Sequence, residues 1–303
     1  MNVSPTLSAL DALAIIRRDY PDFEARTARW LENGWDNRVL DVDDRFIFRF
    51  PREADFPTEI EQRVLALIRD KVAPAIPEPR YFGSEPVYMG YRKIHGDHWN
   101  EEAYLRHDHA TRDRLARDIA EFLWAVHCAV KPAELVAAGL RREDWRARFA
   151  RELEVLDTLS FPGLSEFARE AHADYSRWEG RERELALLFN DLHDENMLLD
   201  ARLRLTGVID FGDVAFGDVH WEFRYLFWLT EDLLERTLKA YAAVSGRELD
   251  VRAIRLCGVV QGLCELALAH RDPNHRVPLE RTRPRVRSWI ERGPRIWREE
   301  ARD

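Results

Sequence analysis

Three polar side chains in the second half of the chain could together support phosphoryl transfer. Asp191 follows an apolar run that begins at Leu187, and Asn196 comes five residues later. Asp210 follows a second apolar segment, residues 205–209. The reaction needs a carboxylate beside the attacking hydroxyl group and oxygen ligands for Mg²⁺. Asp191 suits the first task, because it could take or orient the hydroxyl proton. Asn196 and Asp210 suit the second.

A β-hairpin is predicted between Asn196 and Asp210. Residues 198–200 and 203–205 form two short strand-like segments that a polar turn separates. This hairpin would bring Asn196 and Asp210 close together, with Asp191 on the loop before them. Each of these residues alone is typical of an ordinary turn. The patterns D-x-H-x-x-N and I-D-F-G-D, at this separation, favour a site instead.

These patterns resemble two motifs of the aminoglycoside phosphotransferase family, a relative of the protein kinases, and the resemblance is strongest to the aminoglycoside 2″-phosphotransferase group. The matching residues are Asp191-Leu192-His193-Asp194-Glu195-Asn196 and Ile209-Asp210-Phe211-Gly212-Asp213. The catalytic loop and the metal-binding D-F-G are the analogous parts of protein kinases. The resemblance implies an α+β, bilobal, protein-kinase-like fold with a small antiparallel-sheet N-lobe and a larger, mostly helical C-lobe. It also implies ATP or GTP as phosphate donor, with Mg²⁺ held by Asn196 and Asp210.

One position departs from the family pattern. The family usually has a histidine two residues before the catalytic aspartate, where it braces the loop, and this chain has Phe189 there. Another group must then hold the loop, and His193 is a candidate. Farther along, Gly217, Asp218 and Glu222 resemble a family segment that also braces the catalytic loop.

Arg49 is the predicted phosphate-binding cation. It lies in a hairpin predicted over residues 39–50, on the face that Ile47 shares and opposite three phenylalanines. Kinase-like enzymes usually place a lysine there, which binds the phosphates and a helix carboxylate, and arginine can do both. In the helix predicted over residues 57–69, Glu61 is the candidate carboxylate. Its spacing is equally compatible with an exposed position.

The other expected nucleotide-binding residues come from two segments of the same lobe. The full set is Gly34, Asn37, Arg49, Glu61, Tyr91, Lys93 and Ile94. The first two belong to a turn that resembles the family's phosphate-covering loop. The last three belong to a segment similar to the last N-lobe strand and the hinge, whose backbone binds the purine edge. We therefore expect an N-lobe in residues 1–95 and a C-lobe, with the catalytic loop and the substrate pocket, in residues 96–303.

Acidic residues are expected to bind the acceptor. Glu231 and Asp232 begin a predicted helix, at the place where related enzymes have acids that bind an amine-bearing substrate. Glu265 lies among apolar residues, where an unpaired carboxylate is costly. It could pair with Arg255 or Arg271, or it could face a substrate pocket. The expected substrate-binding residues are Asp191, His193, Glu231, Asp232 and Glu265.

Helices are predicted for most of the remaining chain. Helical periodicity of the apolar residues marks segments 5–18, 113–130, 145–159, 164–178, 220–230, 232–245, 251–270 and 279–291. His127, near the end of the second segment, is expected to pack rather than to react.

Composition and charge exclude several classes of protein. The 303 residues are 46% hydrophobic and 33% charged, as in ordinary soluble proteins. A net charge of -9 argues against a nucleic-acid-binding protein and favours cationic partners. Neither a signal peptide nor a membrane-spanning run is predicted. Cys128, Cys257 and Cys264 are expected to be reduced packing residues. We expect a cytoplasmic monomer that binds no nucleic acid and no membrane.

The function predicted from the sequence is transfer of the γ-phosphate of ATP or GTP to a hydroxyl of a small molecule. An aminoglycoside antibiotic is the expected acceptor, and its modification would confer resistance. Another small alcohol, such as a macrolide, is the first alternative. A catalytically weak, pseudokinase-like protein is the second, because Phe189 and Arg49 replace the usual histidine and lysine. A metal hydrolase that uses Asp191, His193, Asp210 and Asp213 is the third.

Overall fold

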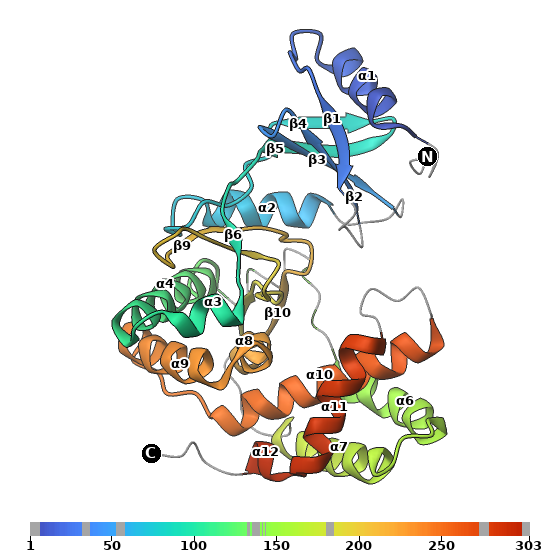
Figure 1. Cartoon of the computed structure of the whole chain (residues 1–303), viewed down its shortest axis with the longest axis vertical. Helices are drawn as coiled ribbons and strands as arrows, with labels where there is room; N and C mark the ends of the chain where they lie inside the picture. Colours follow the sequence, from blue (N-terminus) through green and yellow to red (C-terminus); the bar gives the residue numbers. More distant parts are fainter. Residues whose placement is uncertain are drawn as a thin grey trace.

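The smaller lobe is built on a five-stranded antiparallel sheet, drawn at the top of Figure 1. Its strands in spatial order are β1 (Ala28–Leu31), β2 (Asn37–Val42), β3 (Phe46–Pro51), β5 (Val87–Arg92) and β4 (Tyr81–Ser84). β2 and β3 form the predicted hairpin. Its turn residues, Asp43 and Asp44, have φ angles of 56° and 54°, and this left-handed pair suits a two-residue hairpin turn.

The computed structural model describes residues 7–31, 37–52, 58–131, 134, 140, 142, 144–179, 185–272 and 279–298. Gly34, expected to lie in the phosphate-covering loop, falls outside the described residues. The sheet-containing lobe is followed along the chain by a larger, mostly helical lobe (Figure 1). This is the α+β, bilobal architecture that the sequence predicts.

The two faces of β3 have different environments, as its alternation predicts. Phe46, Phe48 and Phe50 are buried in a cluster with Ile16 of α1 (Ala9–Asp19). Ile47, on the opposite face, packs with Met89 and Tyr91. The second face is therefore free to present Arg49 toward the other lobe.

Helix α2 (Thr58–Ile68) lies between the sheet and the larger lobe (Figure 1). Its apolar residues Val64, Leu65 and Ile68 belong to the same buried cluster as the core of the larger lobe. The helix that carries Glu61 is therefore packed against the lobe that carries Asp191.

A three-stranded sheet follows the connection between the lobes. The chain leaves β5 and reaches β6 (Asp97–His98), which pairs with β8 (Met197–Leu199), and β8 pairs with β9 (Leu205–Val208). This confirms the hairpin between Asn196 and Asp210. Its second strand begins at Leu205 rather than at Leu203, because Leu203 has a φ of 57° and belongs to the turn. A second pair, β7 (Leu185–Leu188) with β10 (Ala215–Asp218), flanks the catalytic loop.

Helices form the rest of the larger lobe. They are α3 (Glu101–Arg106), α4 (His109–His127), α6 (Trp145–Thr158), α7 (Leu164–Glu179), the short η1 (Val219–Trp221), α8 (Arg224–Leu229), α9 (Glu231–Ser245), α10 (Val251–Arg271), α11 (Leu279–Arg292) and α12 (Arg295–Arg298). His127 is buried and hydrogen-bonded to the hydroxyl of Tyr241, with 2.8 Å between Nδ1 and the oxygen. It packs, as predicted.

Helix α10 is buried on nearly all sides, so it forms the centre of this lobe. Two glycines allow its neighbours to approach closely. A Cβ atom at Gly258 would lie 2.7 Å from the ring of Phe227, and one at Gly262 would lie 2.6 Å from the ring of Trp289. Polar residues on this helix, Gln261 and Glu265 among them, are consequently buried and need hydrogen-bond partners.

Two further expectations concern helices and cysteines. No helix in the described ranges combines the length and the apolarity needed to cross a bilayer. Cys257 and Cys264 are buried packing residues, as predicted. Cys128 is exposed, so the prediction was wrong there, because it follows the last turn of α4 rather than facing the core.

Candidate active site

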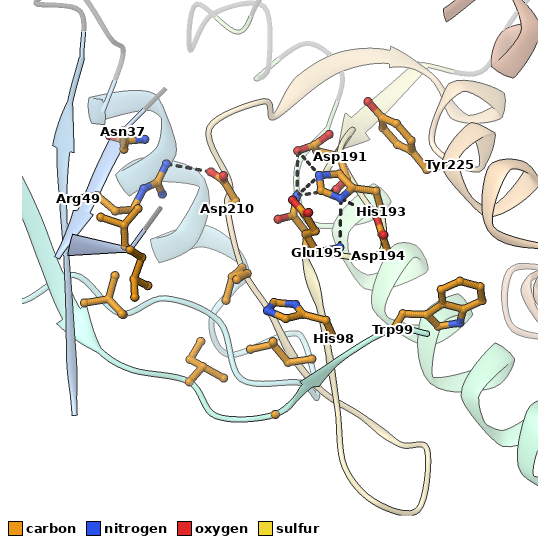
Figure 2. Close-up of a pocket in the computed structure, with 18 of the residues that line it drawn as sticks. Asn37, Arg49, His98, Trp99, Asp191, His193, Asp194, Glu195, Asp210 and Tyr225 are labelled. Carbon is orange, nitrogen blue, oxygen red and sulfur yellow. Dashed lines mark hydrogen bonds and ion pairs between the residues drawn. The ribbon is translucent and has the colours of Figure 1, made fainter. Parts of the chain in front are cut away.

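A cavity of about 1200 Å³ lies where the two lobes meet. Figure 2 shows Arg49 and Asp210 on one side of it, Asp191 and His193 near the middle, and Trp99 and Tyr225 on the other side. Residues from β3, from the hinge segment and from the catalytic loop all line this cavity. The sequence motifs therefore converge on one place.

Asp191 and Asn196 are in direct contact. The side-chain amide of Asn196 donates to the carboxylate of Asp191 at 2.8 Å and to its backbone carbonyl at 2.9 Å. Both residues are buried. Because the NH₂ group of Asn196 is used for these bonds, its amide oxygen is left to face another ligand.

His193 lies beside these two residues. Its Nε2 atom is 3.4 Å from a carboxylate oxygen of Asp191, and its Nδ1 atom is 3.4 Å from a carboxylate oxygen of Asp194. Burial lowers the pKa of the imidazole, but the two carboxylates outweigh it and raise the pKa of His193 to about 10. The ring of His193 therefore lies between two carboxylates, one of which belongs to Asp191.

Glu222 and Arg224 hold the backbone just before Asp191. The carboxylate of Glu222 accepts hydrogen bonds from the backbone N–H groups of Phe189, at 2.8 Å, and Asn190, at 2.9 Å. Arg224 donates to the carbonyl of Asn190 at 2.7 Å. Asn190 has a left-handed φ of 67°, and these bonds fix that conformation. Glu222 thus has the bracing position that the family resemblance implies, and Arg224 was not predicted.

Phe189 fills the place of the missing histidine by packing. Its ring is fully buried and contacts the rings of Phe211 and Phe122, with centroids 4.7 Å and 5.9 Å away. The side-chain amide of Asn190 also donates to the carbonyl of Asp213 at 3.0 Å. The catalytic loop and the D-F-G segment are therefore joined by an aromatic contact and a hydrogen bond.

Arg49 connects the smaller lobe to Asp210. Its guanidinium forms an ion pair with Glu61, as predicted, and a second one with Asp210 at 2.8 Å. Burial disfavours the charged guanidinium, but the carboxylates of Glu61 and Asp210 raise the pKa of Arg49 above its usual value. One planar guanidinium thus orients two carboxylates through different N–H groups. A lysine ammonium is a compact point charge and lacks this forked arrangement of donors.

The oxygen atoms at this place suit Mg²⁺. Asn196 offers an amide oxygen, and the half-exposed carboxylate of Asp210 offers an oxygen beside the one that binds Arg49. Mg²⁺ in nucleotide sites is commonly held by one or two protein oxygens, water and phosphate oxygens. Within the described ranges, no three His, Cys, Asp or Glu side chains are grouped to hold a metal.

Comparison with known proteins decides the family. Residues 27–256 match the model of the phosphotransferase enzyme family. The chain belongs to this family. Similar solved structures include the GDP and kanamycin complex of APH(2″)-IIIa, with 22% identity and a TM-score of 0.77 over 93% of this chain and 98% of that one. The streptomycin–ATP complex of APH(2″)-IIa has 18% identity and a TM-score of 0.67 over 98% and 99% of the two chains.

A macrolide enzyme is similar as well. Macrolide 2′-phosphotransferase type I has 19% identity and a TM-score of 0.68, covering 94% of this chain and 99% of its own. These matches confirm the resemblance to aminoglycoside phosphotransferases and the protein-kinase-like fold. At identities this low, the matches show a shared fold and do not specify the acceptor.

Five of the seven expected nucleotide-binding residues of this phosphotransferase line the cavity, whereas Glu61 does not line it and contacts it only through its ion pair with Arg49. Asn37, Arg49, Tyr91, Lys93 and Ile94 all line it. The ammonium of Lys93 is already bound, however, to Asp41 at 2.8 Å and to Asp44 at 2.5 Å. The ammonium of Lys93 is therefore engaged within the smaller lobe and is not a free cation at the cavity.

Of the five residues expected to bind the acceptor, Asp191, His193 and Glu265 line the cavity. Glu265 is the one whose partner the sequence left open. Neither proposed arginine partner reaches it, because Arg255 binds Glu231 and Arg271 binds Glu152. Instead, Glu265 accepts a hydrogen bond from the side chain of Gln261 at 2.9 Å. The pocket-facing alternative for Glu265 is the one that the structure has.

Glu231 and Asp232 do not line the cavity, contrary to expectation. Asp232 accepts hydrogen bonds from Tyr104 at 2.5 Å, Arg112 at 3.1 Å and Arg236 at 2.9 Å. Burial favours the protonated acid, but the hydrogen bonds from Arg236 and Tyr104 lower the pKa of Asp232 to about 2. Asp232 thus pairs with Arg112 of α4 and Arg236 of its own helix, and Glu231 pairs with Arg255 of α10. Sequence spacing does not reveal these contacts between helices.

Several other residues that line the cavity were not expected to bind substrate or nucleotide. They are His98, Trp99, Glu101, Asp194, Glu195, Tyr225, Trp228, Leu229 and Arg285. They come from β6, α3, the catalytic loop, α8 and α11. Asp194 and Glu195 lie within the D-x-H-x-x-N motif, but the other elements are far apart in the sequence, so no local motif could have grouped them all.

Proposed function

We propose that the protein transfers the γ-phosphate of ATP or GTP to a hydroxyl group of an aminoglycoside. The observation that carries the proposal is the arrangement of Asp191, Asn196 and Asp210 at one cavity, with Arg49 bound to both Glu61 and Asp210. A carboxylate, two metal-binding oxygens and a phosphate-binding cation are the parts that phosphoryl transfer uses.

Each residue has a distinct role in this proposal. The carboxylate of Asp191, which lies beside His193, accepts a hydrogen bond from the acceptor hydroxyl and orients its oxygen for attack. Arg49 binds the phosphates of the donor. Asn196 and Asp210 hold Mg²⁺, which neutralises phosphate charge when it is bound. The rate gain comes mainly from positioning and electrostatic stabilisation, because in this proposal the phosphoryl group passes directly to the acceptor without a covalent bond to the protein.

The side of the cavity opposite Arg49, where Trp99 and Tyr225 lie, is the acceptor end in this proposal (Figure 2). It favours a cation with apolar faces. Four acids line the cavity besides Asp191 and Asp210: Glu101, Asp194, Glu195 and Glu265. They outnumber Arg285, whose guanidinium lies 4.1 Å from the centre of the Trp228 ring. The rings of Trp99 and Tyr225 line the cavity as well. An aminoglycoside carries ammonium groups for the acids and sugar faces for the rings.

A macrolide is the second candidate acceptor. Trp99, Tyr225, Trp228 and Leu229 provide an apolar surface, and the fold is shared with a macrolide 2′-phosphotransferase. A macrolide offers one amine and a large apolar ring, so it would use this surface more than the acids.

The features that favoured a catalytically weak protein are accommodated. Phe189 packs where the histidine would stand, and Glu222 holds the loop. Arg49 makes both ion pairs. These contacts support an active enzyme.

A coupled assay of ADP or GDP release tests the proposal. The purified protein is given each nucleotide with Mg²⁺ and a panel of aminoglycosides, macrolides and simple amino alcohols. We expect acceptor-dependent release with at least one aminoglycoside, and a product heavier by one phosphate in mass spectrometry. Nucleotide binding without transfer to any acceptor would favour the pseudokinase-like alternative, and transfer to macrolides alone would replace the proposed acceptor.

A further inference from the structure

Arg224 is a buried cation held by neutral groups. Its side chain is almost fully buried and donates to three oxygen atoms: the carbonyl of Trp221 at 2.6 Å, the carbonyl of Asn190 at 2.7 Å and the side-chain oxygen of Gln261 at 2.8 Å. Its guanidinium also lies 4.3 Å from the centre of the Tyr225 ring. Within the described part of the chain, no carboxylate forms a salt bridge with it. A guanidinium surrounded by neutral groups is costly to bury. Its hydrogen bonds therefore point to a role beyond packing.

Gln261 has only one orientation that satisfies its neighbours. Its oxygen must face Arg224, because a guanidinium can only donate hydrogen bonds. Its NH₂ group then donates to the hydroxyl of Tyr225 at 3.0 Å and to the carboxylate of Glu265 at 2.9 Å. A flipped amide would place donor against donor at Arg224 and acceptor against acceptor at Glu265. The amide is therefore fixed by the two charged groups on either side.

The two ends of this hydrogen-bonded chain have different surroundings. One end is the carbonyl of Asn190, the residue directly before Asp191. The other end is Glu265, which lines the acceptor end of the cavity together with Tyr225. The ring of Tyr225 also lies 5.6 Å from that of His193. A continuous path thus runs from an acid that faces the acceptor to the backbone that carries Asp191.

We propose that Arg224 and Gln261 are positioning residues that link Glu265 to the catalytic loop, so that an ammonium group of the acceptor at Glu265 steadies Asp191. The proposal deepens the proposed function and rests on it for the nature of the acceptor. An ammonium group beside Glu265 draws its carboxylate into a fixed position. Gln261 and Arg224 transmit that constraint to Asn190, whose left-handed backbone orients Asp191.

The first test is Gln261→Met, which keeps side-chain length and removes the hydrogen bonds. We expect kcat to fall on the order of 10- to 100-fold, because small displacements of a reacting group have effects of this size. The KM for the nucleotide should be unchanged, since Gln261 does not touch that side of the cavity. Glu265→Gln should instead raise the KM for the aminoglycoside.

A reciprocal exchange tests continuity of the chain directly. Gln261→Glu alone places two carboxylates side by side and should lower kcat. The double variant Gln261→Glu/Glu265→Gln restores a donor next to an acceptor at each step, because residue 261 still accepts from Arg224 and residue 265 now donates to it. We expect kcat to return to within a few-fold of the wild type while the acceptor KM stays high.

Hydrogen exchange separates this proposal from the proposed function, because it needs no turnover. In the wild type, kanamycin should slow amide exchange in residues 187–196, and Gln261→Met should speed it and abolish the response. Arg255→Leu is the control, since Arg255 is a buried residue of the same helix that binds Glu231 instead of the catalytic loop. It should lower the melting temperature without changing kcat or exchange in residues 187–196.

The outcomes are distinct. The link is refuted if Gln261→Met leaves kcat and exchange in residues 187–196 at wild-type values, or if the double variant is no faster than Gln261→Glu. If the wild type transfers phosphate to no acceptor, the proposed function fails. Faster exchange in Gln261→Met than in the wild type would then still establish the positioning role of Gln261. Equal exchange in the two proteins would refute that role as well.

Discussion

The ring of Phe189 packs edge-on against the ring of Phe211, with centroids 4.7 Å apart and planes at 67°. Phe189 lies two residues before Asp191, and Phe211 directly follows Asp210. The contact therefore joins the two segments that carry the acids. An apolar ring performs the packing role that the family assigns to histidine, while Glu222 supplies the hydrogen bonds.

Phe189→Ala should lose both stability and activity. Removal of a buried phenylalanine ring typically costs about 3–5 kcal/mol of unfolding free energy, and Asp210 would lose its fixed position relative to Asp191. Urea unfolding measures the first effect and kcat of the folded variant the second. Phe189→Leu keeps most of the side-chain volume, so its stability and its kcat should lie between those of the wild type and those of Phe189→Ala. A wild-type kcat in Phe189→Ala would show that this packing does not position the acids.

Glu222→Gln should lower kcat on the order of 10- to 100-fold with little change in nucleotide affinity. A carboxylate accepts from both backbone N–H groups of the loop, whereas a glutamine offers one acceptor and turns an NH₂ group toward the second donor. Steady-state kinetics and calorimetric titration with nucleotide measure the two effects. Glu152→Gln is the control, because Glu152 is also buried but pairs with Arg271 away from the loop. Equal kinetic losses in the two variants would contradict a specific role for Glu222.

The residues that the sequence predicted well are those whose positions follow from local periodicity. Arg49 and the phenylalanines of β3 alternate, so their faces could be assigned, and the hairpin after Asn196 could be recognised from its turn. The same reasoning predicted the α+β fold and most helices to within a few residues. Glu61 was only a candidate, because its spacing was equally compatible with an exposed position.

The residues that the sequence did not predict depend on how helices pack. Gln261 and Arg224 meet only because α10 is the buried centre of the larger lobe, and its glycines let α8 come close. Asp232 begins a helix as predicted, yet its carboxylate is taken by Tyr104 of α3 and arginines of α4 and α9. Tertiary contacts of this kind have no signature in the spacing of a single segment.

Arg49→Met should destabilise the protein and weaken nucleotide binding. Loss of the guanidinium leaves the buried carboxylate of Glu61 uncompensated, which typically costs about 3–5 kcal/mol. In Arg49→Met/Glu61→Leu no charge is left buried, so most of the stability should return. Nucleotide affinity should stay low in both variants, as titration calorimetry would show. Wild-type affinity in the double variant would mean that Arg49 does not bind the phosphates.

Asp232 should contribute to stability against acid rather than to acceptor binding. Its pKa falls from an ordinary 3.8 to about 2 in the folded protein. A lowered carboxyl pKa stabilises the fold above pH 4, and this contribution disappears as the pH falls from about 4 to about 2. A shift of this size corresponds to about 2.5 kcal/mol of unfolding free energy. Because the side chain of Asp232 is 34% exposed, solvent screening reduces the contribution to about 1 kcal/mol.

Asp232→Asn tests this expectation through urea unfolding at several pH values. The variant should be less stable than the wild type at pH 6, and the difference should vanish near pH 2. Its KM for an aminoglycoside should equal that of the wild type. Asp113→Asn, which removes an exposed partner of Arg236, is the control and should change stability little. A raised acceptor KM in Asp232→Asn would return Asp232 to the acceptor site.

Single-turnover transfer by Asp191→Asn is the most direct test of the central claim, that Asp191 orients and activates the acceptor hydroxyl. Asparagine can still accept the hydrogen bond from Asn196 but cannot act as a base. We predict a loss on the order of 10²- to 10⁴-fold in the transfer rate, with nucleotide affinity and melting temperature close to those of the wild type. Transfer within a few-fold of the wild-type rate would contradict the account.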